Sequence, residues 1–182
     1  MTVDLIIRHC SPTLAGLKVG NLFSFRFESQ RQLYREMYQR NKNLNSKGIY
    51  FEVLRKCDSC ALVYVYRKNQ LIQELNRYEV KEFMRSYGYT GGELESYIQT
   101  LKEHLKYEQF PHEIGLFLGY PLYDVKCFIK NKGYNSKLVG VWKVYGDEHE
   151  AEKTFARFRK CSSIYSKKLS QGFDITQLTV AG

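Results

Sequence analysis

The sequence predicts an α+β fold in which a small, mainly antiparallel sheet carries helices on one side. Residues 21–27 alternate in character with period two, which is typical of a half-buried strand. Residues 49–55 and 61–67 are both rich in β-branched and aromatic residues and are joined by a short polar segment, which predicts a hairpin spanning 49–67. Apolar residues recur at helical spacing over 92–107. A chain of 182 residues with 43% hydrophobic residues predicts one domain with a substantial core.

The amino-terminal elements are predicted from their boundary residues. Ser11 followed by Pro12 indicates a helix start, because serine caps a helix and proline fits the first helical position. Gly20 ends that element, and the strand 21–27 follows. Ser29 is then expected to cap a second helix over about 30–43.

The carboxyl-terminal part is predicted to be mainly helical. Pro111 and Pro121 each begin a short helix that ends near a glycine. Asp147 is a plausible cap for a long last helix. The segments expected after the hairpin are helices over 69–76, 79–87, 92–107, 111–119 and 121–133, a further strand over 138–145 and the long helix up to about Ser170.

The charge balance favours an anionic partner. Lysine and arginine number 28 against 19 acidic residues, which gives a formal net charge of +9. Such an excess is typical of proteins that bind RNA, DNA or a ribonucleoprotein, although a basic surface without any anionic partner remains the alternative. No apolar run reaches the roughly 18 residues that a membrane span needs, and the amino terminus lacks a signal-peptide pattern. We therefore expect a cytoplasmic protein with no membrane partner and, for its five cysteines, reduced thiols.

A basic and aromatic pattern gives the candidate nucleic-acid-binding residues. Aromatic rings stack on unpaired bases, and flanking cations hold phosphates. The alternative is that most of these tyrosines cover the core with their hydroxyls at its rim. The candidates are Arg31, Tyr34, Arg35, Tyr38 and Arg40 on one predicted helix and Tyr64, Tyr66 and Arg67 on the hairpin.

One thiol has a candidate catalytic setting. Cys10 directly precedes the predicted helix start, where the helix dipole favours a thiolate. His112 would then act as a base and Glu113 would orient its imidazole, provided that the fold brings them together. The alternative is a small buried cysteine and a capping histidine. Cys57 and Cys60 have metal-ligand spacing but no second pair of ligands, so we expect no metal and no other cofactor.

Four segments carry a resemblance to a known family: RHCSPTLAGLKVGNLFS, ALVYVYR, FPHEIGLFLGYPLYDVKCFIKNKG and GVWKVYGD. They resemble domain of unknown function 3793, an uncharacterised family found mostly in anaerobic Firmicutes. The resemblance spans nearly the whole chain and implies a bacterial or mobile-element origin and a single-domain fold, but no reaction. The size and basic charge are also loosely similar to those of small mobile-element anti-CRISPR proteins that inhibit Cas9, a group without a common fold.

The leading hypothesis is a small basic protein that binds RNA or a ribonucleoprotein and modulates it. An inhibitor of Cas9 that acts on the guide RNA is one concrete version. The second hypothesis is a cysteine-dependent enzyme or redox protein that uses Cys10 with His112. The third is a structural adaptor, which would show a large exposed apolar patch and no concentration of charge.

Overall fold

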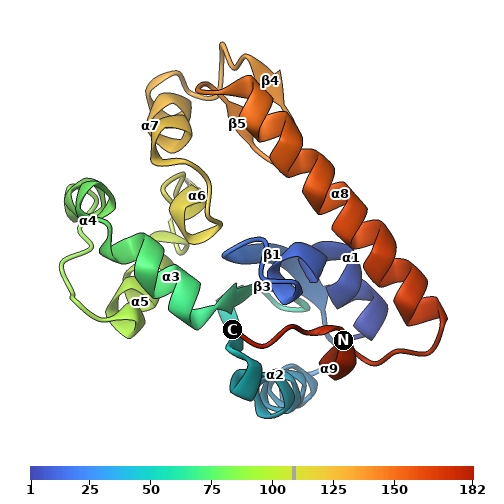
Figure 1. The fold of residues 1–182 in the computed structure, drawn as a ribbon. Helices are drawn as coiled ribbons and strands as arrows, with labels where there is room; N and C mark the ends of the chain where they lie inside the picture. Colours follow the sequence, from blue (N-terminus) through green and yellow to red (C-terminus); the bar gives the residue numbers. More distant parts are fainter. Residues whose placement is uncertain (108–109) are drawn as a thin grey trace.

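A computed structural model describes residues 1–107 and 110–182 of the chain. Over these two ranges the chain forms nine α-helices, a three-stranded antiparallel sheet and a separate two-stranded hairpin, which confirms the α+β fold (Figure 1). None of the helices in the described ranges combines the length and the apolar composition that a membrane crossing requires.

The main sheet contains the predicted hairpin and the predicted amino-terminal strand. Its strands β1 (Gly20–Arg26), β2 (Ile49–Lys56) and β3 (Cys60–Arg67) follow the order β1-β3-β2, and both pairings are antiparallel. The register shifts between Val53 and Arg55 on β2, which marks a β-bulge near the hairpin end.

Helices cover both faces of the sheet, so the prediction of helices on one side was wrong. The physical reason lies in β3, where Val63 and Val65 point to one face, Tyr64 and Tyr66 point to the other, and all four are buried. The core cluster on the first face includes residues of α1 (Val3–Leu14), α2 (Gln30–Leu44) and α9 (Ile175–Leu178), and of α8 (Glu148–Ser170), which packs on α1. The cluster on the second face includes residues of α3 (Lys68–Asn76), α4 (Tyr78–Arg85), α5 (Leu94–His104), α6 (Ile114–Phe117) and α7 (Leu122–Lys130).

The first helix starts earlier than its Ser-Pro signal predicts. Thr2 is the N-cap of α1, and its Oγ1 accepts a hydrogen bond from the Leu5 N–H at 3.3 Å. Ser11 and Pro12 therefore lie in the last turn of α1 rather than in its first. Pro12 removes one helical hydrogen bond close to the helix end, where few turns depend on it. The Ser11 hydroxyl does not cap a helix, because it donates a hydrogen bond to the Ile7 carbonyl within α1.

Residues 138–145 do not add a strand to the main sheet, which corrects the prediction. They form a small hairpin of β4 (Leu138–Val139) and β5 (Lys143–Val144) that stands apart at one end of the molecule (Figure 1). The turn passes close to the Phe155 ring of α8, and a Cβ atom on Gly140 would lie 2.2 Å from that ring. Glycine at this position therefore lets the chain reverse against α8. The predicted cap of α8 is confirmed, since Asp147 Oδ1 accepts from the Glu150 N–H at 3.1 Å.

Candidate functional site

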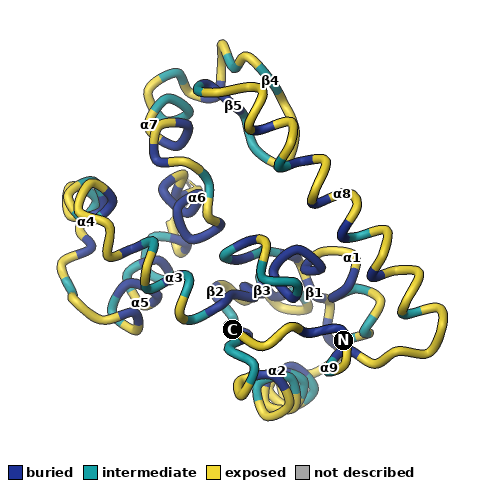
Figure 2. The backbone as a smooth tube through the Cα atoms, viewed as in Figure 1, coloured by how far each residue is buried: buried dark blue, intermediate teal, exposed yellow. Residues whose placement is uncertain are grey.

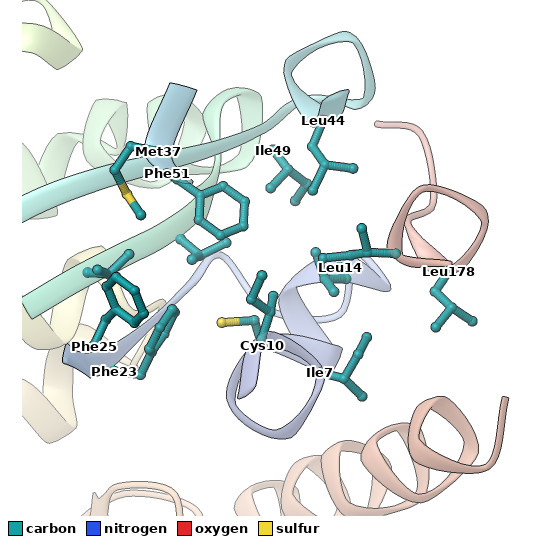
Figure 3. Packing of buried hydrophobic residues seen from close by; sticks show 14 of the residues in the cluster. Ile7, Cys10, Leu14, Phe23, Phe25, Met37, Leu44, Ile49, Phe51 and Leu178 are labelled. Atoms are coloured by element: carbon teal, nitrogen blue, oxygen red, sulfur yellow. The ribbon is translucent and has the colours of Figure 1, made fainter. Parts of the chain in front are cut away.

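Cys10 lies inside the hydrophobic core and not at a helix start. It is fully buried in the carboxyl-terminal half of α1, in a cluster with Ile7, Leu14 and Phe23 (Figure 3). Burial raises the pKa of the Cys10 thiol well above its usual range. The prediction that the helix dipole favours a thiolate at Cys10 is therefore wrong. Cys10 does not lie at the amino-terminal end of a helix, and its apolar surroundings favour the neutral thiol.

The structure does not assemble Cys10, His112 and Glu113 into a catalytic set. Cys10 belongs to the core cluster on the α1 face of the sheet, whereas His112 and Glu113 directly precede α6, whose residues pack on the opposite face. The His112 ring packs edge-on against Phe128, with their centroids 4.9 Å apart. The carboxylate of Glu113 pairs with a different histidine.

That histidine is His104, at the end of α5. Its Nδ1 lies 2.8 Å from Glu113 Oε1, which also accepts a hydrogen bond from the Tyr89 hydroxyl at 3.1 Å. Glu113 is buried, and together with burial its carboxylate raises the pKa of Tyr89 so that the hydroxyl remains a donor. The Glu113 carboxylate fixes the orientation of the His104 imidazole through Nδ1, and Nε2 is the ring nitrogen that does not contact Glu113. Sequence reasoning missed His104 because its partner lies in a loop beyond α5.

The His104 ring borders a hollow of about 340 Å³ that adjoins a second, mostly apolar hollow of about 380 Å³. Phe110 and His112 line both of them. An oriented imidazole is the arrangement that a general base uses, but covalent catalysis also needs a nucleophile. No serine, threonine or cysteine lies among the described residues that line the His104 hollow, which are Tyr87, His104, Tyr107, Phe110, Pro111, His112, Glu113 and Ile129.

The exposed side of α2 carries four of the eight predicted nucleic-acid-binding residues, Arg31, Tyr34, Arg35 and Tyr38. Tyr34 is 59% exposed and Tyr38 is 64% exposed. Most of α2 is exposed along its outer side (Figure 2). Lys56 of β2 extends the surface, with its Nζ 5.8 Å from the centroid of the Tyr34 ring. We call this surface the α2 stripe; it consists of Arg31, Tyr34, Arg35, Tyr38 and Lys42, with Lys56 beside it.

The cations of the α2 stripe are not neutralised by the protein. In the described part of the chain, none of Arg31, Arg35, Lys42 and Lys56 forms an ion pair with an acidic residue. Arg40, in contrast, does not belong to the stripe. Its guanidinium donates to the Met1 carbonyl at 2.8 Å and pairs with Glu36 at 3.6 Å, so its role is to hold the amino terminus.

The three hairpin candidates are structural, which corrects the prediction that they contact nucleic acid. Tyr64 is fully buried and donates to the Phe117 carbonyl, and the Tyr66 ring stacks on it with centroids 4.8 Å apart. Burial raises the pKa of both phenols. Arg67 is only 3% exposed, and its guanidinium donates to the backbone carbonyls of Thr13, Leu14 and Val180. For Tyr64 and Tyr66, the alternative hypothesis that these tyrosines cover the core is therefore correct.

Of the two cysteines with metal-ligand spacing, Cys57 lies in the turn after β2 and Cys60 is the first residue of β3. Cys57 is exposed and Cys60 is partly buried, and the Cys57 N–H donates to the Cys60 carbonyl at 2.8 Å. Within residues 1–107 and 110–182, no group of three or more His, Cys, Asp or Glu side chains is close enough to hold a metal ion.

Comparison with known proteins gives one match. A family model described as a protein of unknown function, DUF3793, matches residues 6–179. No curated protein and no solved structure matches the chain. The family description carries no activity, so a function has to be argued from the surfaces of the molecule.

Proposed function

The chain belongs to the DUF3793 family, and we propose that it binds single-stranded RNA, free or within a ribonucleoprotein, through the α2 stripe. The observation that supports the proposal is the arrangement of exposed cations beside exposed rings on one helical face. Arg31 and Arg35 are one turn apart, as are Tyr34 and Tyr38, so a row of guanidinium groups runs beside a row of rings. This pairing suits a strand whose phosphates contact the cations and whose bases stack on the rings.

The electrostatics of the stripe favour a bound anion. Like charges one turn apart destabilise a helix by about 0.2–0.5 kcal/mol, and in the described ranges no acidic side chain forms an ion pair with Arg31 or Arg35. A phosphate between the two guanidinium groups would remove this repulsion and accept hydrogen bonds from both. The wider charge of +9 adds a long-range attraction for the same partner.

The test is the salt dependence of binding to a fluorescently labelled single-stranded oligouridylate. We expect Arg31→Gln with Arg35→Gln to weaken binding and to reduce the slope of log K against log salt by about 1.4, because each phosphate contact with a single strand contributes about 0.7. Tyr34→Ala with Tyr38→Ala should weaken binding by about 1–3 kcal/mol per lost stacked base and leave the slope nearly unchanged.

A charge-matched control separates a site from a general charge effect. Arg157→Gln with Lys160→Gln removes two exposed cations from α8 and should leave both affinity and slope close to the wild-type values. Equal losses in this control and in the α2 double variant would refute the stripe as the site. Absence of any binding by the wild-type protein at low salt would refute RNA binding itself.

A guide RNA held by Cas9 is one ribonucleoprotein partner of this chemical class. A more specific version of the proposal is that the α2 stripe binds the guide RNA of Cas9 and thereby inhibits DNA cleavage. The measurement is the cleavage rate in the presence of excess wild-type protein or of the α2 double variant. Cleavage that the wild-type protein leaves unchanged rejects the Cas9 version, whereas the oligouridylate experiment decides the general one.

A further inference from the structure

A third hollow lies between α1, the start of β1, the β4–β5 hairpin and α8. Its volume is about 340 Å³. We call it the Lys18 hollow. Its polar lining consists of basic or hydrogen-bonding side chains and includes no carboxylate among the described residues. The polar lining residues are His9, Lys18, Asn21, Arg159 and Ser162, and the apolar ones are Pro12, Val141 and Phe158.

Lys18 is the unusual residue of this hollow. Its side chain is 6% exposed, and its Nζ lies 5.2 Å from the centroid of the Tyr120 ring. In the part of the chain that the structure describes, no carboxylate and no hydrogen-bond acceptor pairs with this ammonium group. Burial of most of the side chain lowers the pKa of Lys18 to about 8. The ammonium nitrogen itself is open to the hollow, and a mostly buried charge without a protein partner is typical of functional sites.

The surrounding backbone holds the lining in place. After α1 the chain turns at Gly16, whose φ of +77° favours glycine, and the N–H groups of Leu17 and Lys18 both donate to the Pro12 carbonyl, at 2.8 and 3.2 Å. Asn21 Oδ1 accepts from the Thr13 hydroxyl at 2.7 Å, so the amide nitrogen of Asn21 is the end left to donate. Lys18 and Asn21 are therefore presented by a fixed turn and strand.

We propose that the Lys18 hollow binds the phosphate group of a small phosphomonoester. Lys18 and Arg159 supply two positive charges, and His9, Asn21 and Ser162 supply further hydrogen-bond donors. Two cations without a carboxylate suit a dianion, and an arginine fork matches two phosphate oxygens. The apolar walls face the organic part of the ligand. The site is separate from the α2 stripe, whose residues do not line the hollow.

The probes are inorganic phosphate, adenosine 5′-monophosphate and adenosine, each titrated calorimetrically into the full-length protein in phosphate-free buffer. We expect the monophosphate to bind more tightly than inorganic phosphate and adenosine not to bind. Lys18→Met should weaken binding of the monophosphate at least about tenfold, because it removes a charge-assisted hydrogen bond and keeps the apolar stem. Arg159→Gln should weaken it several-fold, and because Arg159 is exposed this variant tests the site without disturbing the core.

Two controls make the result specific. Lys160→Gln removes the next cation along α8, which does not line the hollow, and should leave binding unchanged. Arg31→Gln with Arg35→Gln should also leave it unchanged, so failure of the phosphate site and failure of the RNA proposal are distinguishable. Absence of saturable monophosphate binding, equal binding by wild type and Lys18→Met, or tighter binding of inorganic phosphate than of the monophosphate would each overturn the proposal.

Discussion

Replacing Lys18 by methionine is expected to stabilise the protein near neutral pH. Burial lowers the pKa of Lys18 from its usual 10.5 to about 8. Each pH unit of this difference corresponds to about 1.4 kcal/mol, so the charged side chain costs the folded state about 3 kcal/mol at pH 7. Methionine keeps an unbranched apolar chain in the same space and removes the charge. For a chain of this length, about 3 kcal/mol raises Tm by about 6–12 °C.

The pH dependence carries the sharper test. Because the pKa of Lys18 is lower in the folded state, the unfolded chain binds more protons between about pH 8 and pH 10.5, and the wild type gains stability as the pH rises through that window. The stabilisation by Lys18→Met should therefore be largest below pH 8 and disappear towards pH 10.5. Among the groups that face Lys18, burial raises the pKa of Cys10 above this window and the pKa of Tyr120 to about 12. His9 and Arg159 also line the hollow, and because both proteins contain them they do not account for a difference between the two.

The assay is urea unfolding of both proteins at pH 7 and pH 10 in phosphate-free buffer, since a bound phosphate would itself stabilise the wild type. Lys160→Met, an exposed position on α8, is the matched control and should change stability by less than about 0.5 kcal/mol at either pH. Destabilisation by Lys18→Met at pH 7, or a stabilisation that is the same at both pH values, would refute the argument.

Three further perturbations test other parts of the structure. A maleimide should modify the exposed Cys57 of the native protein quickly and Cys10 only after unfolding, and mass spectrometry that finds early labelling of Cys10 would contradict its burial. Arg67→Lys should lower the free energy of unfolding by about 2–4 kcal/mol, because an ammonium group cannot reach all three carbonyls that the guanidinium contacts, and a loss below 1 kcal/mol in urea unfolding would argue against this role. Asp124→Asn should lower the free energy of unfolding by about 1.5–3 kcal/mol and shift the fluorescence of Trp142, because Asp124 accepts hydrogen bonds from the Trp142 indole at 2.7 Å and from two backbone N–H groups after β5. An unchanged emission spectrum together with unchanged stability would contradict this role of Asp124.

The sequence predicted most elements correctly where the signal is local. Ser29 and Asp147 cap α2 and α8 as expected, because a cap is made by a side chain and an N–H group three residues away. The hairpin was predicted for the same reason, since its strands adjoin along the chain. The start of α1 was predicted wrongly at Ser11, because Thr2 had already capped a helix whose buried residues continue past the serine.

The sequence by itself therefore determined the element types, the net charge, the family resemblance and the placing of Arg31, Tyr34, Arg35 and Tyr38 on one helix through their spacing. Only the tertiary structure decided which basic and aromatic residues remain accessible: it buried Arg67 and Tyr64 and exposed Tyr34. It also brought Lys18 and Arg159 to one hollow. The physical reason is distance along the chain, because burial and pairing depend on segments that meet only when the helices pack on both faces of the sheet.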